Sequence, residues 1–298
     1  MDVAGQTVSL PALVALGVAV GLIAGVFGVG GGFILTPLLS AVLGIPVPIA
    51  VGTGLCQMVG TATVALLRHR KLAQGDERFG LIMAAPSLIG VATGARCVKA
   101  LTELGDWQLA GQPVPIVTLV LYLAFILFLV GGAFAMWQRS GARSDELEYV
   151  RRGPFARVEF GPLVDLPAVR LSRVSAFVIA YSGLGLGFLS GLLGVGGGIA
   201  LIPLLLYGFG FPIRHAAGTG ISVLLVTAVV GTLVHAVEGH VHLGVALLLS
   251  IGASISAQVG AELTNRLPAK FLRQGFIWVI GVAILSIVWD VVRRVLQT

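Results

Sequence analysis

The sequence predicts an all-α fold, a polytopic transmembrane helical protein with two inverted-topology repeats of about five apolar segments each. The first observation is composition, since 57% of the 298 residues are hydrophobic and only 11% are charged, against about 45–50% and about 25% in soluble domains. The second is that apolar residues gather in runs long enough to cross a bilayer. The third is an internal repeat, at a constant offset of 166 residues, between the motifs that begin at Gly25 and Gly191.

Ten apolar runs are expected to form membrane helices, five in each repeat, where a spanning helix needs roughly 17–25 mostly apolar residues. The runs 33–43 and 199–209 are too short to span comfortably, so they either span or re-enter, and the sequence leaves both open. Short, glycine- and proline-interrupted runs at matching places in two halves are typical of a transporter binding site. The ten runs are residues 8–27, 33–43, 48–67, 79–98, 114–137, 174–193, 199–209, 213–237, 243–263 and 271–292.

A polar segment divides the chain into an N-terminal transmembrane repeat (1–137), a cytoplasmic linker (138–173) and a C-terminal transmembrane repeat (174–298). The linker holds 12 of the 32 charged residues of the chain. Side chains alternate moderately between apolar and polar over 157–166, which predicts a small β-rich flap, with a regulatory contact as the alternative.

Lys and Arg set the expected orientation, because cytoplasmic loops carry an excess of both. With the N-terminus outside, inside loops hold 15 of the 19 Lys and Arg residues and outside positions hold 4. The sequence therefore predicts outer N- and C-termini and a cytoplasmic linker. Basic residues that lie between apolar runs form no stripe with aromatic residues, which argues against a nucleic-acid partner. The first residues carry Asp2 and no basic residue, so the first run is expected to be retained.

The repeat covers two blocks in each half. The segment Gly25–Leu39 matches Gly191–Leu205 at 10 of 15 positions, and 44–54 matches 210–220 at six of 11. Because each half has five segments, an odd number, the second half is expected to be inverted relative to the first. Inverted halves that exchange roles give alternating access, with the substrate held between them near the bilayer midplane.

Two glycine clusters are the first candidate substrate-binding elements. Glycine lets the backbone approach a ligand closely, and a helix that begins after the cluster directs free N–H groups at an anion. The alternative is a tight turn for helix packing. The candidate residues are Gly30, Gly31, Gly32, Gly196, Gly197 and Gly198.

Two Gly-Thr-Gly motifs supply the next candidates. Thr53 and Thr219 occupy equivalent positions, so their hydroxyls are expected to bind one oxyanion from both sides. Gln57 and Ser222 lie about one turn beyond them and add further donors. The alternative is that each threonine bonds to the preceding turn of its own helix.

The remaining polar residues give weaker evidence for a functional site. Glu238, His240 and His242 cluster in one loop. They could relay protons or bind a metal, and the alternative is an ordinary solvated loop. No metal-ligand spacing supports the metal. The sequence therefore predicts no catalytic residue, no cofactor and no metal.

The paired GVGGG clusters, each followed by a proline (Pro37, Pro203) and a Gly-Thr-Gly, resemble the TauE/SafE sulfite exporter family over nearly the whole chain except 138–172. The resemblance implies a permease of the bacterial inner membrane that moves a small sulfur-containing or organic anion, such as sulfite or a sulfonate. It also implies that the glycine clusters and Gly-Thr-Gly positions form the substrate site.

The leading functional hypothesis is a secondary permease, not an enzyme, whose partners are a small anionic substrate and the lipid bilayer. No ATP-binding motif is visible, so a coupling ion, proton or sodium, stays open, as does a homo-oligomer. The alternatives are a membrane-embedded enzyme, which usually has several His, Asp or Glu in helical spacing, and a membrane subunit of a larger transporter or channel.

Overall fold

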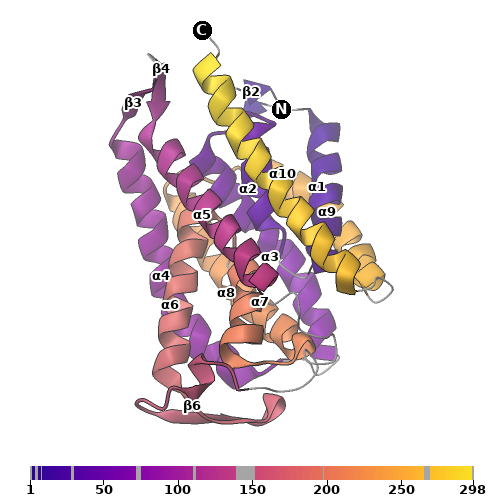
Figure 1. Ribbon diagram of the computed structural model, residues 1–298. Coiled ribbons are helices and arrows are strands. Elements are labelled where there is room, and N and C mark those ends of the chain that lie inside the picture. Colours follow the sequence, from indigo (N-terminus) through magenta and orange to yellow (C-terminus); the bar gives the residue numbers. More distant parts are fainter. Residues whose placement is uncertain are drawn as a thin grey trace.

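The computed structural model of the chain describes residues 2–3, 6–7, 9–27, 30–71, 75–109, 112–138, 152–196, 198–264 and 269–296. Within this part the protein is an all-α polytopic membrane protein (Figure 1), and its helices follow the ten expected apolar runs. The helices are α1 (Leu10–Phe27), α2 (Gly32–Ala41), α3 (Val47–Lys71), α4 (Glu77–Glu103), α5 (Ile116–Gln138), α6 (Ala176–Leu193), α7 (Gly198–Pro203), the π-helix η4 (Leu204–Phe209), α8 (Ile213–Val237), α9 (Leu243–Thr264) and α10 (Ala269–Leu296).

Short strands and turns lie outside these helices, in three two-stranded antiparallel hairpins. They are β1 (Asp2–Val3) with β2 (Gln6–Thr7), β3 (Asp106–Leu109) with β4 (Gln112–Pro115), and β5 (Leu163–Leu166) with β6 (Leu171–Ser175), together with the 3-10 turns η2 (Phe155–Arg157) and η3 (Pro167–Val169).

Five helices of the described part are long and apolar enough to cross a membrane: those at 47–67, 77–103, 176–193, 215–237 and 243–260. Their outer faces carry large apolar side chains, for example Leu81 of α4 and Ile255 of α9, which are 72% and 67% exposed. Broad apolar surface of this kind is stable against lipid rather than water.

The short segments turn back instead of crossing. Ser40, at the end of α2, and Tyr122, early in α5, have hydroxyls 2.8 Å apart, and α5 begins at the end of the molecule where α1 begins (Figure 1). In the other half the Gly153 N–H, ahead of α6, donates to the Phe209 carbonyl at the end of η4 (3.3 Å). Each short segment therefore returns to the side from which the preceding helix came, and both re-enter.

Helices from different halves make the closest packing, α1 on α9 and α4 on α6. A Cβ added at Gly25 would lie 2.9 Å from the Ala257 Cα, and one added at Gly191 would lie 2.9 Å from the Val91 Cα. Glycine is needed at both positions because real Cβ atoms do not come so close. Both members of one contact lie 166 residues from the members of the other, so the two halves make the same contact twice.

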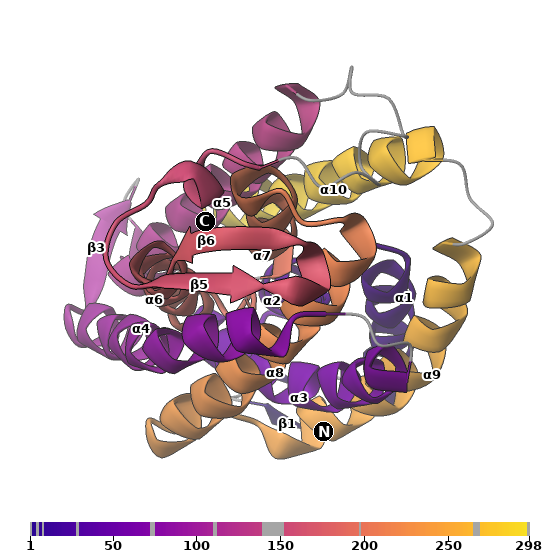
Figure 2. The ribbon, with the colours of Figure 1, turned by 90° about the horizontal axis from the view of Figure 1, so that it is seen from below.

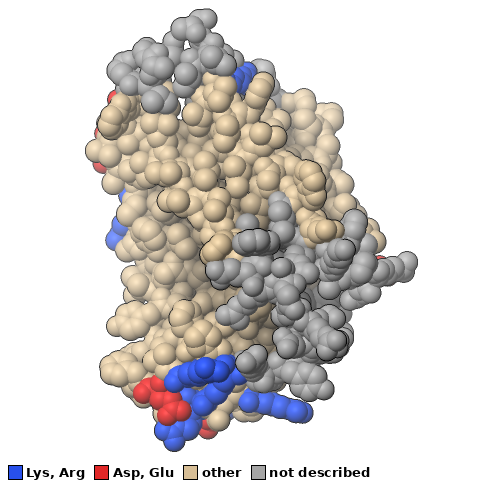
Figure 3. Space-filling view, in the orientation of Figure 1, with Lys and Arg blue, Asp and Glu red and all other residues tan. Residues whose placement is uncertain are grey.

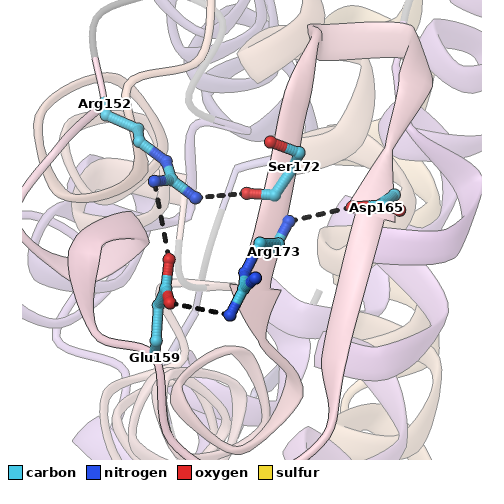
Figure 4. A network of polar contacts seen from close by, with 5 residues as sticks. All are labelled: Arg152, Glu159, Asp165, Ser172 and Arg173. Atoms are coloured by element: carbon cyan, nitrogen blue, oxygen red, sulfur yellow. Dashed lines mark hydrogen bonds and ion pairs between the residues drawn. The ribbon is translucent and has the colours of Figure 1, made fainter.

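Residues 152–175 form a cap at the end of the bundle opposite the termini, where β5 and β6 cross in front of α7 when seen from below (Figure 2). The Glu159 carboxylate accepts a hydrogen bond from the Arg173 guanidinium (3.1 Å) and forms an ion pair with Arg152 (3.7 Å). The Asp165 carboxylate accepts the Arg173 N–H at 2.9 Å, and Arg152 also donates to the Ser172 carbonyl (Figure 4). Of the β-rich segment expected at 157–166, only 163–166 forms a strand, and its partner β6 lies beyond the expected range. Residues 139–151 of the linker lie outside the described part.

The cap joins the bundle through an aromatic cluster. Phe79, at the start of α4, packs edge-on against Phe209 and Phe211, with ring centroids 4.9 and 4.8 Å apart, and Phe155 of η2 packs on Phe209. Such pairs are worth about 0.5–1.5 kcal/mol each beyond the area they bury. This cluster fixes the end of η4 against the cap.

Candidate functional site

A cavity of about 190 Å³ lies where the two halves meet. Its walls come from α1, α3, α7, α8 and α9, and it contains one glycine of each cluster. Among the residues that line it are Gly30, Thr61, Gly198, Gly220, Leu224 and Gln258.

The polar groups of the cavity are neutral. Thr61 Oγ1 donates to the Met58 carbonyl (3.2 Å) and Gln258 Nε2 donates to the Ser254 carbonyl (3.3 Å), and all three side chains, Thr61, Ser254 and Gln258, line the space. Within the described part, no charged side chain does so. The site therefore offers hydroxyl and amide groups on an otherwise apolar wall, which is the usual make-up of a small-molecule pocket.

The glycine clusters approach each other at the centre of the molecule. Gly30, Gly31 and Gly196 have φ values of 77°, 73° and 65°, in the left-handed region that favours glycine. A Cβ at Gly32 would lie 2.8 Å from the Gly194 carbonyl oxygen of the other cluster. The tight packing expected as the alternative is therefore present, while close approach of the backbone to a ligand stays a prediction. Gly197 lies outside the described residues.

Two repeat-related side chains pack against the clusters. A Cβ at Gly30 would lie 2.7 Å from Leu224 Cδ1, and one at Gly196 would lie 2.9 Å from Met58 Sδ. Met58 and Leu224 are 166 residues apart and both are buried. The centre of the molecule is therefore occupied by a pair of equivalent apolar side chains.

Thr53 and Thr219 do not meet. Thr53 Oγ1 accepts the His242 N–H (3.0 Å), and Thr219 Oγ1 accepts the Asp76 N–H (2.9 Å). The two bonds are equivalent, because both threonines and both partners differ by 166 residues. Each hydroxyl anchors the residue just before a long helix, α9 or α4, and neither lines the cavity.

Gln57 and Ser222 also lie off the cavity wall. Gln57 is 1% exposed, and its Oε1 has no hydrogen-bond partner among the described residues. The Ser222 hydroxyl donates to the Gly218 carbonyl in its own helix (3.2 Å). Of the ten residues expected from the sequence, the cavity wall therefore takes Gly30 and Gly198.

Sequence reasoning missed Thr61, Ser254 and Gln258, which line the cavity. The repeat itself carried the signal for one of them, because Thr61 is identical to its equivalent Thr227. It also missed Asp290, which is 4% exposed in α10 and accepts the Tyr122 hydroxyl at 2.7 Å. Nothing local in the sequence marks that pair, whose members lie 168 residues apart.

The loop with Glu238 and His240 lies at the end of the molecule opposite the cap. Glu238 pairs with Lys99 (2.8 Å), and that hydrogen bond lowers the pKa of the Glu238 carboxyl. Burial lowers the pKa of His240. No group of three or more His, Cys, Asp or Glu in the described part is placed to hold a metal ion. The contact that the structure shows for Glu238 is its ion pair with Lys99.

Comparison with known proteins gives one family. The family model described as "Sulfite exporter TauE/SafE" matches residues 13–287. A probable membrane transporter protein of Methanocaldococcus jannaschii is 25% identical over 92% of this chain and 93% of its own length. The probable membrane transporter proteins YunE and YdhB of Bacillus subtilis are 25% and 26% identical, over 87% and 85% of this chain and 89% of each relative. No solved structure matches.

Proposed function

The chain belongs to the TauE/SafE sulfite exporter family, and on this premise we propose that it is a secondary permease that moves a small sulfur-containing or organic anion, such as sulfite or a sulfonate, by alternating access. Membership in a family of membrane transporters fits a carrier and not an enzyme. The observation that carries the proposal is the cavity that joins Gly30 of the first glycine cluster to Gly198 of the second.

The packing supports two inverted repeats. The contacts of Gly25 with Ala257 and of Gly191 with Val91 are equivalent, and so are the loop anchors of Thr53 and Thr219. The helix α1 begins at the end of the molecule that holds the termini, whereas α6 begins at the opposite end, next to β6 (Figure 1). Two halves with equivalent contacts and opposite directions are what a carrier with exchangeable conformations requires.

The cavity suits a substrate that must be released again. Thr61 and Gln258 present neutral groups, so each hydrogen bond that they donate to a bound anion contributes about 1.5–3 kcal/mol, the range for bonds with one charged partner. An anion held in this way lacks the further attraction of a full opposite charge and leaves more readily than one paired with a cation. A buried Arg or Lys would hold it more tightly and slow its exit.

The proposed setting is the bacterial inner membrane, with both termini outside and the cap in the cytoplasm. On the face drawn in Figure 3 the largest gathering of charged side chains lies at the cap. Its described cations include Arg152, Arg157, Arg170 and Arg173, and an excess of arginine is typical of the cytoplasmic side.

The test is flux of sulfite into proteoliposomes, beside sulfate, methanesulfonate and a carboxylate, with proton and sodium gradients applied in turn to identify a coupling ion. Ser254→Phe fills the cavity. Ile255→Phe introduces the same residue at the neighbouring position, which is 67% exposed on the outer face of α9, and serves as the matched control.

We expect flux of at least one of these anions in the wild type and in Ile255→Phe, and its loss in Ser254→Phe. Wild-type flux that survives Ser254→Phe in folded protein would mean that the substrate path lies elsewhere. No flux of any anion from folded wild-type protein would contradict a self-sufficient anion permease and favour a membrane subunit that needs a partner.

A further inference from the structure

The cavity occupies only one of two positions that the repeat makes equivalent. Its residues Thr61, Gly30 and Leu224 correspond to Thr227, Gly196 and Met58 at the offset of 166. If the two halves were in the same conformation, a second cavity would lie beside Thr227. In the structure, apolar side chains pack closely around Gly231, at the equivalent of the cavity-lining Ala65.

The second position is closed by apolar side chains. A Cβ at Gly231 would lie 2.9 Å from Leu55 Cδ1 and 3.3 Å from Val91 Cγ1, and both side chains are fully buried. Their equivalents in the first half-site, Ile221 and Ala257, line the open cavity. The same pair of positions is therefore open in one half and collapsed in the other.

Buried hydroxyls without partners lie in the collapsed position. Thr36 is 1% exposed and Ser190 is 0% exposed, and neither Thr36 Oγ1 nor Ser190 Oγ has a hydrogen-bond partner in the described part of the chain. Their equivalents, Ile202 and Ala24, line the open cavity. Nearly all buried polar groups in proteins are hydrogen-bonded, so two exceptions at equivalents of cavity-wall residues need a common explanation.

Thr227 adds a third hydroxyl, and its contacts show the collapse. Thr227 Oγ1 bonds to the Leu224 carbonyl (3.0 Å) and reaches the Gly196 carbonyl (3.5 Å). Its equivalent Thr61 keeps the first bond, to Met58 (3.2 Å), but has no bond to Gly30, which stands across the open cavity. Opening the second position would release the Thr227 hydroxyl in the same way.

We propose that Thr36, Ser190 and Thr227 form a second half-site for the same anion, collapsed in this structure, which opens as the first cavity closes. Met58 and Leu224 are the barrier between the half-sites. This inference rests on the alternating access of the proposed function. Each half-site has three neutral side chains that can donate a hydrogen bond: Thr61, Ser254 and Gln258 in the open one, and Thr36, Ser190 and Thr227 in the collapsed one. The anion then passes from one neutral set of donors to the other.

The first test is thiol reactivity of reconstituted protein in a Cys56→Ser/Cys97→Ser background, with N-ethylmaleimide as the probe. Ser190→Cys is compared with Ser87→Cys, which is as deeply buried but whose position belongs to neither half-site. Because minor conformations populated at about 0.1–10% are common, we expect Ser190→Cys to react at least about tenfold faster than Ser87→Cys. Equal rates would overturn the second half-site.

Anion flux separates this inference from the function on which it rests. If the wild type moves an anion but Ser190→Cys reacts with N-ethylmaleimide no faster than Ser87→Cys, the permease function stands and the second half-site is contradicted. A reactive Ser190→Cys in a protein that moves no anion would support the opening and contradict the permease. Inert thiol and absent flux together would reject both.

A second variant avoids any new reactive group. Thr36→Val keeps the side-chain volume and removes the unpaired hydroxyl. The collapsed conformation is stabilised, because no buried hydroxyl is left without a partner, while the second half-site loses a hydrogen-bond donor when it opens. We expect a higher melting temperature together with at least a fivefold loss of flux, a change within the usual range of coupling. The control is Thr93→Val, whose hydroxyl bonds only within its own helix. Unchanged flux in Thr36→Val would contradict the proposal.

Discussion

Glycine at the α4–α6 interface gives the sharpest prediction about stability. A Cβ added at Gly187 would lie 2.7 Å from the Ser87 Cα and closer still to the Ser87 carbonyl oxygen. Carbon atoms in contact prefer about 3.5–4.0 Å, so Gly187→Ala must push the two helices apart by about 1 Å. Two residues away, a Cβ at Gly185 would meet nothing within 4 Å.

The two substitutions are expected to act in opposite directions. Overpacking of this kind typically costs about 1–3 kcal/mol, and we take about 2 kcal/mol for Gly187→Ala because the neighbouring contacts along the interface loosen with it. Gly185→Ala gains about 0.5–1 kcal/mol, since alanine loses less backbone freedom in a helix than glycine. At about 2–4 °C per kcal/mol for a chain of this size, Gly187→Ala should lower the melting temperature by about 4–8 °C and Gly185→Ala should raise it slightly.

The assay is thermal unfolding of purified protein in detergent, followed by fluorescence, with both variants measured beside the wild type. Comparable melting temperatures for Gly187→Ala and Gly185→Ala would refute the close approach of α4 and α6. So would a Gly187→Ala variant that is more stable than the wild type.

Two further predictions concern the loops. Thr219→Val leaves the buried Asp76 N–H without its acceptor, which should cost about 1–3 kcal/mol; Thr232→Val, whose hydroxyl bonds only to its own helix, should cost much less, and equal melting temperatures would contradict the anchor. Glu238 has a folded-state pKa lowered mainly by the hydrogen bond from Lys99, so its stabilisation is complete above the ordinary carboxyl pKa of about 4.3 and is lost as the pH falls through the lower folded value. The wild type should therefore melt above Glu238→Gln at pH 7 and converge with it in acid, and a gap independent of pH would rule this out.

The helices were predictable because the membrane demands long apolar runs. The run expected at 213–237 coincides with α8 (Ile213–Val237), and the short runs after the glycine clusters are helical too. The second part of the run 199–209 forms the π-helix η4, and Pro203 is the only local feature of the sequence that indicates this change of helix type. Whether a short run crosses or returns depends on its partners at the end, such as Phe209 with Gly153, and those lie far apart in sequence.

The contacts of the candidate site residues were less predictable, for a related reason. Duplication marked Thr53 and Thr219, and the structure places them equivalently, but as acceptors from backbone groups 189 and 143 residues away. A pattern along one helix cannot reveal such a partner. The cavity wall at Ser254 and Gln258 is likewise assembled from different helices, and the repeat could point only to Thr61.

Because α1 packs on α9 and α4 packs on α6, each half buries its helix surfaces against the other half rather than against its own residues. Gly25 finds its partner in Ala257 and Gly191 finds its partner in Val91, each across the boundary between the halves. We therefore expect a chain that is cut between α5 and α6 to hold together as two fragments, because each fragment supplies the helix surface against which the other packs.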